Sequence, residues 1–379
     1  MKNDFLEYYE EHHISPVKQN IKDIKMHYER RKKLYRQCGI PTIAFRNADV
    51  LEVGPGGGYN TLAFFHWNSK HVDLVEANPW GRADISRLFE EHKIPQDKYT
   101  VYSCKIEDYK TEKKYDIIIA EGFIQNLYNQ QEVITKLQDL VAEDGIIVIT
   151  CCDHVCFFIE TMKRLVGWSL TANISDYNEK VDFLVNFFEP QLAQLKGVSK
   201  EPKDWVQDQI LDVPNVNGTE LSMLQAIDYF GKEFEILGCS PQMFTDYSWY
   251  KDIWFDYKKD YKEQFRTKRL SLLMANMPEL ILSLSQVDIL VQHFENIKKL
   301  EQEYEDTLDN KKISSIMDEL NYVEELLQQD FDNDFVKVLC EIREVLLCIQ
   351  NDKKIIMNRY PHFFAAFGRT QQYIGFVKK

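Results

Sequence analysis

The sequence predicts an α/β domain built on an open, mostly parallel β-sheet with helices on both faces. The first observation is a short apolar run, residues 49–53, that stops at a turn containing four glycines. The second is that further apolar runs follow, each with an amphipathic segment behind it, as in buried parallel strands joined by helices. The third is the length of 379 residues, which is enough to bury a large core in two or three structural units.

The strands of this sheet are predicted from apolar runs that end at turn residues. The predicted strands are residues 49–53, 71–76, 99–103, 115–120 and 146–150. Helical spacing of apolar residues predicts helices between them, over residues 61–67, 80–92 and 130–141. Because the carboxyl ends of parallel strands share one edge of an open sheet, a ligand is expected at that edge.

A helix over residues 12–37 is predicted to precede the sheet and to form part of an N-terminal segment, residues 1–44, that caps the site. Ser15 is a suitable N-cap, with Pro16 at the first helical position. The opposite face carries lysines and the helix ends in a run of cations, which favours a solvated basic face over a phosphate-binding patch.

The second half of the chain predicts helices rather than further βα units. The aromatic-rich residues 168–230 are expected to form a folded insertion over the active-site mouth, within a domain spanning residues 45–257. Three apolar stripes at helical spacing then predict a C-terminal helical domain over residues 258–379. These helices are a possible surface for homo-oligomerisation.

The composition argues against several classes of protein. The formal net charge of −14 argues against a nucleic-acid backbone as the main partner, because such a partner needs a basic face. No apolar run reaches the roughly 18 residues of a membrane span, and the N-terminus lacks the apolar core of a signal peptide. The eight cysteines show no paired C-x-x-C spacing and are expected to be buried thiols. We expect a cytoplasmic protein without a membrane anchor.

The spacing of the glycines in this turn distinguishes between several nucleotide-binding patterns. The dinucleotide fingerprint fails because its third glycine position holds Tyr59, and the P-loop fails because it lacks the lysine. The pattern that fits is acidic-x-Gly-x-Gly-x-Gly, given by Glu52, Gly54, Gly56 and Gly58. In this stretch the chain resembles the class I S-adenosylmethionine-dependent methyltransferases. The resemblance implies that the loop approaches the methionine part of S-adenosylmethionine, with Glu52 close to it.

The resemblance extends to the strands that follow. Glu76 ends the second strand, and the resemblance implies that it accepts the two ribose hydroxyls of the cofactor beside Ala77. The acid usually found after the third strand is displaced here by Lys105-Ile106, so we expect Ile106 to pack on the adenine ring and Glu107 to replace the acid. Glu121, at the end of the fourth strand, is expected to border the methyl donor or the acceptor.

The resemblance also implies a complete topology and a reaction. The fold would be a Rossmann-like, doubly wound sheet of seven strands, closed by an antiparallel pair for which residues 234–238 and 248–253 are candidates. The reaction would be in-line transfer of the sulfonium methyl, leaving S-adenosylhomocysteine. Asp153 and His154, just after the fifth strand, are the candidate general bases. We expect no metal, because Asp153 is the one obvious carboxylate after the fourth and fifth strands.

The acceptor itself is left open by the sequence. The negative charge and the insertion favour a small or medium polar metabolite, such as a sugar or a nucleotide-linked sugar. The alternative within the same class is an RNA or a protein docked on the basic N-terminal helix. The alternatives from other classes are a nicotinamide-dependent oxidoreductase and a non-catalytic cofactor-binding scaffold.

Overall fold

A computed structural model describes the chain over residues 5–15, 18–193, 200–212, 220–247, 249–251, 260–275, 277, 282–327 and 334–379. The chain divides into two compact units. Unit 1 comprises residues 1–152, 215–265 and 371–379, and unit 2 comprises residues 153–214 and 266–370.

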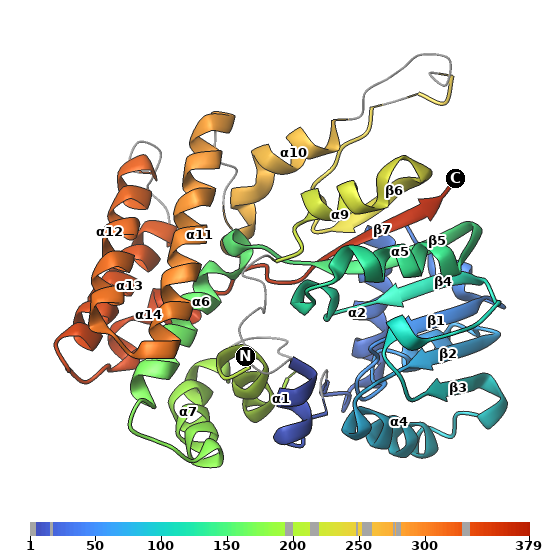
Figure 1. Cartoon of the computed structure of the whole chain (residues 1–379), viewed down its shortest axis with the longest axis horizontal. Helices are drawn as coiled ribbons and strands as arrows, with labels where there is room; N and C mark the ends of the chain where they lie inside the picture. The colour runs from blue at the N-terminus through green and yellow to red at the C-terminus, as the bar shows by residue number, and fades with distance from the viewer. Residues whose placement is uncertain are drawn as a thin grey trace. The chain divides into compact units, whose positions relative to one another are not determined.

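Unit 1 contains a seven-stranded sheet in the order β3-β2-β1-β4-β5-β7-β6 (Figure 1). The first five strands run parallel, and β7 is antiparallel to both of its neighbours. Their bounds are β1 Asp49–Val53, β2 His71–Val75, β3 Tyr99–Tyr102, β4 Tyr115–Ala120, β5 Val141–Cys151, β6 Phe234–Ser240 and β7 Gln372–Lys378. The predicted Rossmann-like, doubly wound, mostly parallel sheet of seven strands is confirmed.

The antiparallel pair differs from the sequence prediction. The strand that pairs with β6 is β7, at the end of the chain, and β7 also pairs with β5. Of the predicted strand 248–253, residues 248, 252 and 253 lie outside the described residues, and residues 249–251 form no strand. The seventh strand lies within residues 258–379, for which the sequence predicts a helical domain, and its alternating residues Ile374 and Phe376 are buried in the sheet.

The helices of unit 1 cover the sheet on both faces. The helices α2, α3 and α4 contribute Tyr35, Phe64 and Phe89 to one apolar core together with alternate residues of the central strands. The helix α5 packs on β5 and on α9 instead, and Figure 1 shows α5 and α2 on different sides of the strands. The bounds are α1 Phe5–Glu11, α2 Ile24–Gln37, α3 Leu62–His66, α4 Pro79–Glu91, α5 Gln130–Leu140 and α9 Met223–Phe230, with α10 Tyr261–Lys268 crossing the unit boundary.

The helix predicted over residues 12–37 is shorter than expected. It begins at Ile24, where Asp23 is the N-cap and its carboxylate accepts the Met26 N–H at 3.0 Å. Ser15 therefore does not cap this helix, and Pro16 lies outside the described residues. Asp23 is as good a cap as Ser15, which is why the sequence alone placed the helix start too early.

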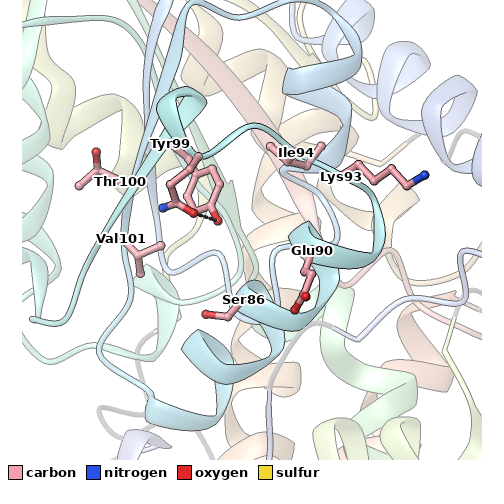
Figure 2. Close-up of a pocket in the computed structure, with 8 residues that line it drawn as sticks. Ser86, Glu90, Lys93, Ile94, Tyr99, Thr100 and Val101 are labelled. Carbon is pink, nitrogen blue, oxygen red and sulfur yellow. Dashed lines mark hydrogen bonds between the residues drawn. The ribbon is translucent and has the colours of Figure 1, made fainter.

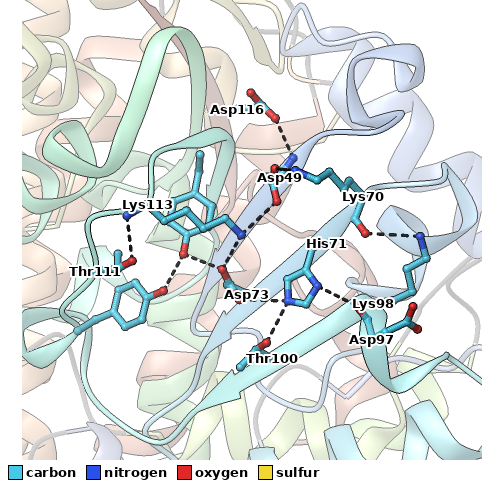
Figure 3. A network of polar contacts seen from close by, with 12 residues as sticks. Asp49, Lys70, His71, Asp73, Asp97, Lys98, Thr100, Thr111, Lys113 and Asp116 are labelled. Carbon is cyan, nitrogen blue, oxygen red and sulfur yellow. Dashed lines mark hydrogen bonds and ion pairs between the residues drawn. The ribbon is translucent and has the colours of Figure 1, made fainter.

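The amino ends of the parallel strands carry a charged network on the edge away from the glycine turn (Figure 3). The Lys113 ammonium bridges the carboxylates of Asp49 and Asp73 at 3.1 and 3.0 Å. The buried Asp73 also accepts the Tyr115 hydroxyl at 2.8 Å and lies 3.4 Å from a ring nitrogen of His71. These contacts satisfy the polar groups of this edge internally, so we assign the network to the stability of the sheet.

Unit 2 is helical. It contains α6 His154–Leu170, α7 Tyr177–Leu192, α8 Pro202–Trp205, α11 Leu284–Thr307, α12 Asn310–Leu327, α13 Asp334–Gln350 and α14 Pro361–Ala365. The predicted C-terminal helices α11, α12 and α13 share one core with α6 and with α7 from the predicted insertion. Part of that insertion and the C-terminal helices are thus one packed body, which their separation in sequence did not indicate.

The centre of unit 2 holds a buried charge cluster. The Arg164 guanidinium of α6 binds the carboxylates of Asp212, Glu301 and Glu305. Glu301 also accepts the buried Lys298 ammonium at 3.0 Å. Burial raises the pKa of Glu305 well above its ordinary value, which favours the protonated form of this carboxyl group beside two cations.

No described helix is both long and apolar enough to cross a membrane.

Candidate active site

The loop after β1 needs its glycines. Gly54, Gly56 and Gly58 have φ angles of +66°, +55° and +77°, in the left-handed region that side-chain-bearing residues rarely adopt. A Cβ on Gly54 would lie 3.0 Å from the Phe123 ring, and one on Gly58 would lie 3.0 Å from Ile85. The loop is therefore a bare stretch of main chain at the carboxyl end of the central strand.

Glu76, at the end of β2, holds this loop in place. Its Oε2 accepts the Gly56 N–H at 2.7 Å, and its Oε1 accepts the Asn78 N–H at 2.7 Å. The residue is 5% exposed, and burial raises its pKa to about 7 although both N–H bonds oppose the shift. Gly81 of α4 lets the helix approach, because a Cβ there would lie 2.9 Å from the Gly56 carbonyl oxygen. The predicted acid and glycine loop are thus in direct contact.

Glu52 occupies a different position from Glu76. It is buried in β1, and its carboxyl group accepts the Thr61 hydroxyl at 2.5 Å. Burial raises its pKa to about 8, so this side chain carries a proton at neutral pH. The side chain supports the loop from within the core, and the prediction that it lies close to the methyl donor stays a prediction.

Glu121, at the end of β4, belongs to a polar cluster that the sequence did not predict. Its Oε1 accepts Arg31 Nη2 at 2.5 Å and the Tyr35 hydroxyl at 2.8 Å, and its Oε2 lies 3.4 Å from the Asn60 amide nitrogen. Arg31 and Tyr35 are buried on α2. A signal was present in the sequence, since Arg31 falls on the same helical stripe as Tyr28 and Tyr35 rather than on the solvated basic face.

A histidine ties α2 to the glycine loop. The ring Nε2 of His27 lies 3.0 Å from the Tyr59 carbonyl oxygen. Burial and, to a smaller extent, the Arg31 charge lower the pKa of His27 to about 4, so the ring is neutral at pH 7 and donates its N–H to that carbonyl. Helix α2 therefore carries both the Arg31 cluster and a direct restraint on the loop.

The remaining predicted cofactor residues lie beside the strand ends of unit 1. Ile106 is buried in a short 3₁₀ helix, Ile106–Asp108, after β3. Glu107 accepts the Asn129 amide at 2.9 Å. Ala77 is half-buried between Glu76 and the N-cap of α4, and its carbonyl oxygen accepts an Arg82 N–H at 2.5 Å. The structure gives all three a defined position, and their contacts with a cofactor stay predictions.

The candidate bases lie in unit 2, at the start of α6. Asp153 is the N-cap of this helix: its Oδ1 accepts the Cys156 N–H at 3.0 Å, and its Oδ2 accepts Arg269 Nε at 2.7 Å. Burial lowers the pKa of His154 to about 4, against the raising effect of Asp153. The histidine is thus neutral at pH 7, whereas the carboxylate is committed to two N–H donors.

Two other features bear on the site. Within the described ranges, no group of three His, Cys, Asp or Glu residues could hold a metal ion. A surface pocket of about 830 Å³ lies between α4 and β3 and is shown in Figure 2. Its lining contains none of the predicted site residues and consists of Ser86, Glu90, Lys93, Ile94, Gln96, Tyr99, Thr100 and Val101.

The comparison with known families agrees with this geometry. The sequence model of a family described as "Methyltransferase domain" matches residues 25–184, which include all but the first residue of α2, the glycine loop, Glu76 and Glu121. Over these residues, less than half of its length, the chain is similar to the S-adenosylmethionine-dependent methyltransferases, as the sequence predicted. It is an enzyme whose cofactor is S-adenosylmethionine.

Several curated proteins resemble this methyltransferase. A protein of Rickettsia felis named "Ubiquinone biosynthesis O-methyltransferase" is 23% identical over 217 residues, which is 53% of this chain and 80% of that protein. A protein of the same name from Rickettsia bellii is 25% identical over 219 residues, or 53% of this chain and 82% of that protein. At these identities the acceptor named for the relatives is not transferred to this chain.

Solved structures give a weaker likeness. The N-methyltransferase NodS of Bradyrhizobium japonicum, in complex with S-adenosylhomocysteine, has a TM-score of 0.32 at 16% identity and covers 40% of this chain and 74% of that one. An S-adenosylmethionine-dependent methyltransferase of Listeria monocytogenes has a TM-score of 0.28 at 16% identity and covers 34% of this chain and 55% of that one. At such TM-scores these likenesses carry no argument of their own.

The residues of the methyltransferase fit its cofactor. The three left-handed glycines form a turn without any Cβ after β1, with Gly54 packed close to Phe123 and Gly58 close to Ile85. Each carboxylate oxygen of Glu76 accepts one N–H bond, and because a carboxylate has about four acceptor positions it can still accept two hydroxyls. The N–H groups of Gly54 and Gly58 donate to the carbonyl oxygens of Val75 and Pro55, and that of Gly56 donates to Glu76. The part of the site that suits the cofactor is therefore the spare acceptor capacity of Glu76, which matches the two hydroxyls of a ribose.

Proposed function

We propose that this methyltransferase acts on a hydroxyl group of a small or medium polar metabolite, such as a sugar or a nucleotide-linked sugar. The observation that supports the proposal is the Glu121 cluster. It places a carboxylate, a guanidinium, a phenol and an amide at the same sheet edge as the glycine loop. Such groups orient a polar acceptor by hydrogen bonds rather than by apolar contact.

The chain's own residues would divide the work of methyl transfer. The bound cofactor supplies an electrophilic methyl group, which leaves sulfur as the acceptor oxygen bonds to it. Glu76 and the glycine loop would hold the cofactor, and Glu121 with Arg31 would orient the acceptor. We retain Asp153 and His154 as the proposed bases for the hydroxyl proton. The neutral His154 ring is in the protonation state that a base requires, whereas Asp153 would first have to exchange its bond to Arg269.

A phenolic hydroxyl is the second candidate acceptor. It is favoured by the name of the Rickettsia relatives, which are O-methyltransferases of ubiquinone biosynthesis. A quinone precursor differs from a sugar in its aromatic ring, so the two candidates separate by the pocket chemistry that they need. Both retain a hydroxyl as the methyl acceptor.

The alternative of an RNA or protein acceptor rests on α2. Lys25, Arg30, Lys33 and Arg36 are exposed on this helix, and no ion pair is recorded for them within the described part of the chain. If these cations dock a nucleic acid, the affinity falls steeply with salt. A cytoplasmic location and assembly through the C-terminal helices likewise stay predictions.

Initial rates with a panel of acceptors test the proposal. We would measure S-adenosylhomocysteine release with sugars, nucleotide-linked sugars, catechols and a bulk RNA sample at two salt concentrations. Turnover of a sugar hydroxyl supports the first proposal, and turnover of catechols alone would replace it with the second. RNA methylation that collapses at high salt would contradict both. Binding of NAD without binding of S-adenosylhomocysteine would indicate an oxidoreductase, and cofactor binding without any turnover would indicate a scaffold.

A further inference from the structure

The segment before α2 is fastened across the cofactor-binding end of unit 1. The Ile14 carbonyl oxygen accepts the Asn78 side-chain amide at 3.0 Å. The His13 ring lies 4.5 Å from the Trp80 ring, measured between centroids. Asn78 also donates its backbone N–H to Glu76. A direct chain of contacts thus runs from residues 5–15, which we call the N-terminal strap, to the acid that holds the glycine loop.

One polar group of the strap is buried beside the loop without a bond. The Ser15 side chain is 6% exposed, and its hydroxyl has no hydrogen-bond partner among the residues that the structure describes. The same oxygen lies 3.3 Å from the position that a Cβ on Gly57 would take. Ser15 Oγ therefore faces the middle of the glycine loop. The Thr61 hydroxyl behind that loop, in contrast, is bonded to Glu52.

The energetic cost of this arrangement indicates an absent partner. A buried hydroxyl that has lost water and gained no bond costs about 1–3 kcal/mol. An alanine at this position would avoid the cost, and the serine does not cap α2, whose N-cap is Asp23. A ligand lying on the glycine loop would meet the hydroxyl and remove the cost.

We propose that Ser15 Oγ hydrogen-bonds to the bound S-adenosylmethionine and that the N-terminal strap covers the cofactor. This inference rests on the assignment of the glycine loop as the cofactor site, and it does not depend on the acceptor. Ser15 acts as a binding residue: its hydroxyl can donate to a carboxylate or accept from an amino group or a hydroxyl of the cofactor. The Asn78 bond and the His13–Trp80 contact hold the strap over the loop.

Titration calorimetry with S-adenosylhomocysteine, in the absence of any acceptor, tests this assignment. Ser15→Ala is expected to weaken binding about 10-fold, the equivalent of one hydrogen bond of about 1.4 kcal/mol. The melting temperature of the cofactor-free variant is expected to equal or exceed that of the wild type, because an unsatisfied buried hydroxyl is removed. The control Ser86→Ala, an exposed serine of α4 in the same unit, should change neither quantity.

Hydrogen exchange of the wild-type protein provides a second readout. Saturating S-adenosylhomocysteine should slow amide exchange in residues 5–15 and leave α12, in the other unit, unchanged. Unchanged affinity in Ser15→Ala would overturn the proposal, as would a variant that melts earlier without cofactor yet binds normally. Unchanged exchange in the strap would also overturn it. Failure of every acceptor, with cofactor binding intact, would refute the proposed acceptor class and leave this assignment standing.

Discussion

Replacing Glu76 by glutamine is the most informative single change in the site. The two carboxylate oxygens accept two backbone N–H groups, each at 2.7 Å. A glutamine keeps one acceptor oxygen and turns an NH₂ group toward the other N–H, so either Gly56 or Asn78 loses its partner. A buried N–H left unpaired costs about 1–3 kcal/mol, and we expect Glu76→Gln to lower the free energy of unfolding by about 2 kcal/mol.

Cofactor binding should respond more strongly than stability. The variant loses the bond to Gly56 or the bond to Asn78, and it also loses half of its acceptor capacity toward the ribose hydroxyls. We expect S-adenosylhomocysteine affinity to fall at least about 30-fold, equivalent to about 2 kcal/mol. Glu76→Ala, which removes both acceptors, is expected to abolish binding.

The pH dependence of this residue has a definite sign. Burial raises the Glu76 pKa from 4.5 to about 7, so between these values the folded protein binds more protons than the unfolded chain. Its contribution to stability therefore falls as the pH rises from 4.5 to 7. Cofactor affinity should instead increase as the pH rises, because the ionised carboxylate is the better acceptor for hydroxyls.

Calorimetry between pH 6 and pH 8, with thermal melts of the same samples, measures both effects. Wild-type affinity should increase over this range, and the Glu76→Gln affinity should not. The matched control is Glu90→Gln, an exposed acid on α4. If Glu76→Gln binds S-adenosylhomocysteine as tightly as the wild type, the assignment of this carboxylate to the cofactor is refuted.

Four further substitutions probe other parts of the molecule. Glu52→Gln should stabilise the protein at pH 9 by at least about 1 kcal/mol, because burial raises the Glu52 pKa to about 8 and wild-type stability falls as pH rises toward that value. In denaturant titrations Glu305→Gln should lower the free energy of unfolding by less than about 1 kcal/mol. Arg164→Leu should lower it by about 3–5 kcal/mol, because buried carboxylates are left unpaired. Arg31→Met should lower kcat/KM at least about 30-fold by leaving Glu121 without its guanidinium, with circular dichroism as the folding control.

For each of these predictions, one outcome would contradict it. Glu52→Gln with the same stability as the wild type at pH 9 would show that the carboxyl group is not held protonated. A Glu305→Gln variant as damaged as Arg164→Leu would show that all three carboxylates are ionised. Unchanged turnover by a folded Arg31→Met variant would remove the Glu121 cluster from the reaction.

The parts of the fold that the sequence predicted are those with a local signal. The strand ending at Val53 and the acid that follows β2 could be predicted from apolar runs and spacing, and both lie where predicted. The seventh strand could not, because β7 is separated from β6 by more than 130 residues and its neighbours are set by tertiary pairing. The start of α2 was misplaced because Ser15 and Asp23 are equally good caps.

The site residues that the sequence predicted are likewise those of a local motif. The glycine loop and Glu76 follow from a short motif, whereas the Arg31–Tyr35–Glu121 cluster depends on how α2 packs against β4. Arg31 stands among many cations in a basic run, and its place on the stripe of Tyr28 and Tyr35 is the one sequence signal for the burial that the structure shows. The place of Asp153 after β5 predicts a base, and the structure adds that Asp153 caps α6 and binds Arg269.

The central claim is that bare main chain after β1, held by Glu76, binds the methyl donor. A crystal of the protein soaked with S-adenosylhomocysteine tests it most directly. We predict electron density on the loop formed by Gly54, Gly56 and Gly58, with the ribose hydroxyls within hydrogen-bonding distance of the Glu76 carboxylate. Density for the cofactor elsewhere, or a saturated crystal with an empty glycine loop, would contradict the account.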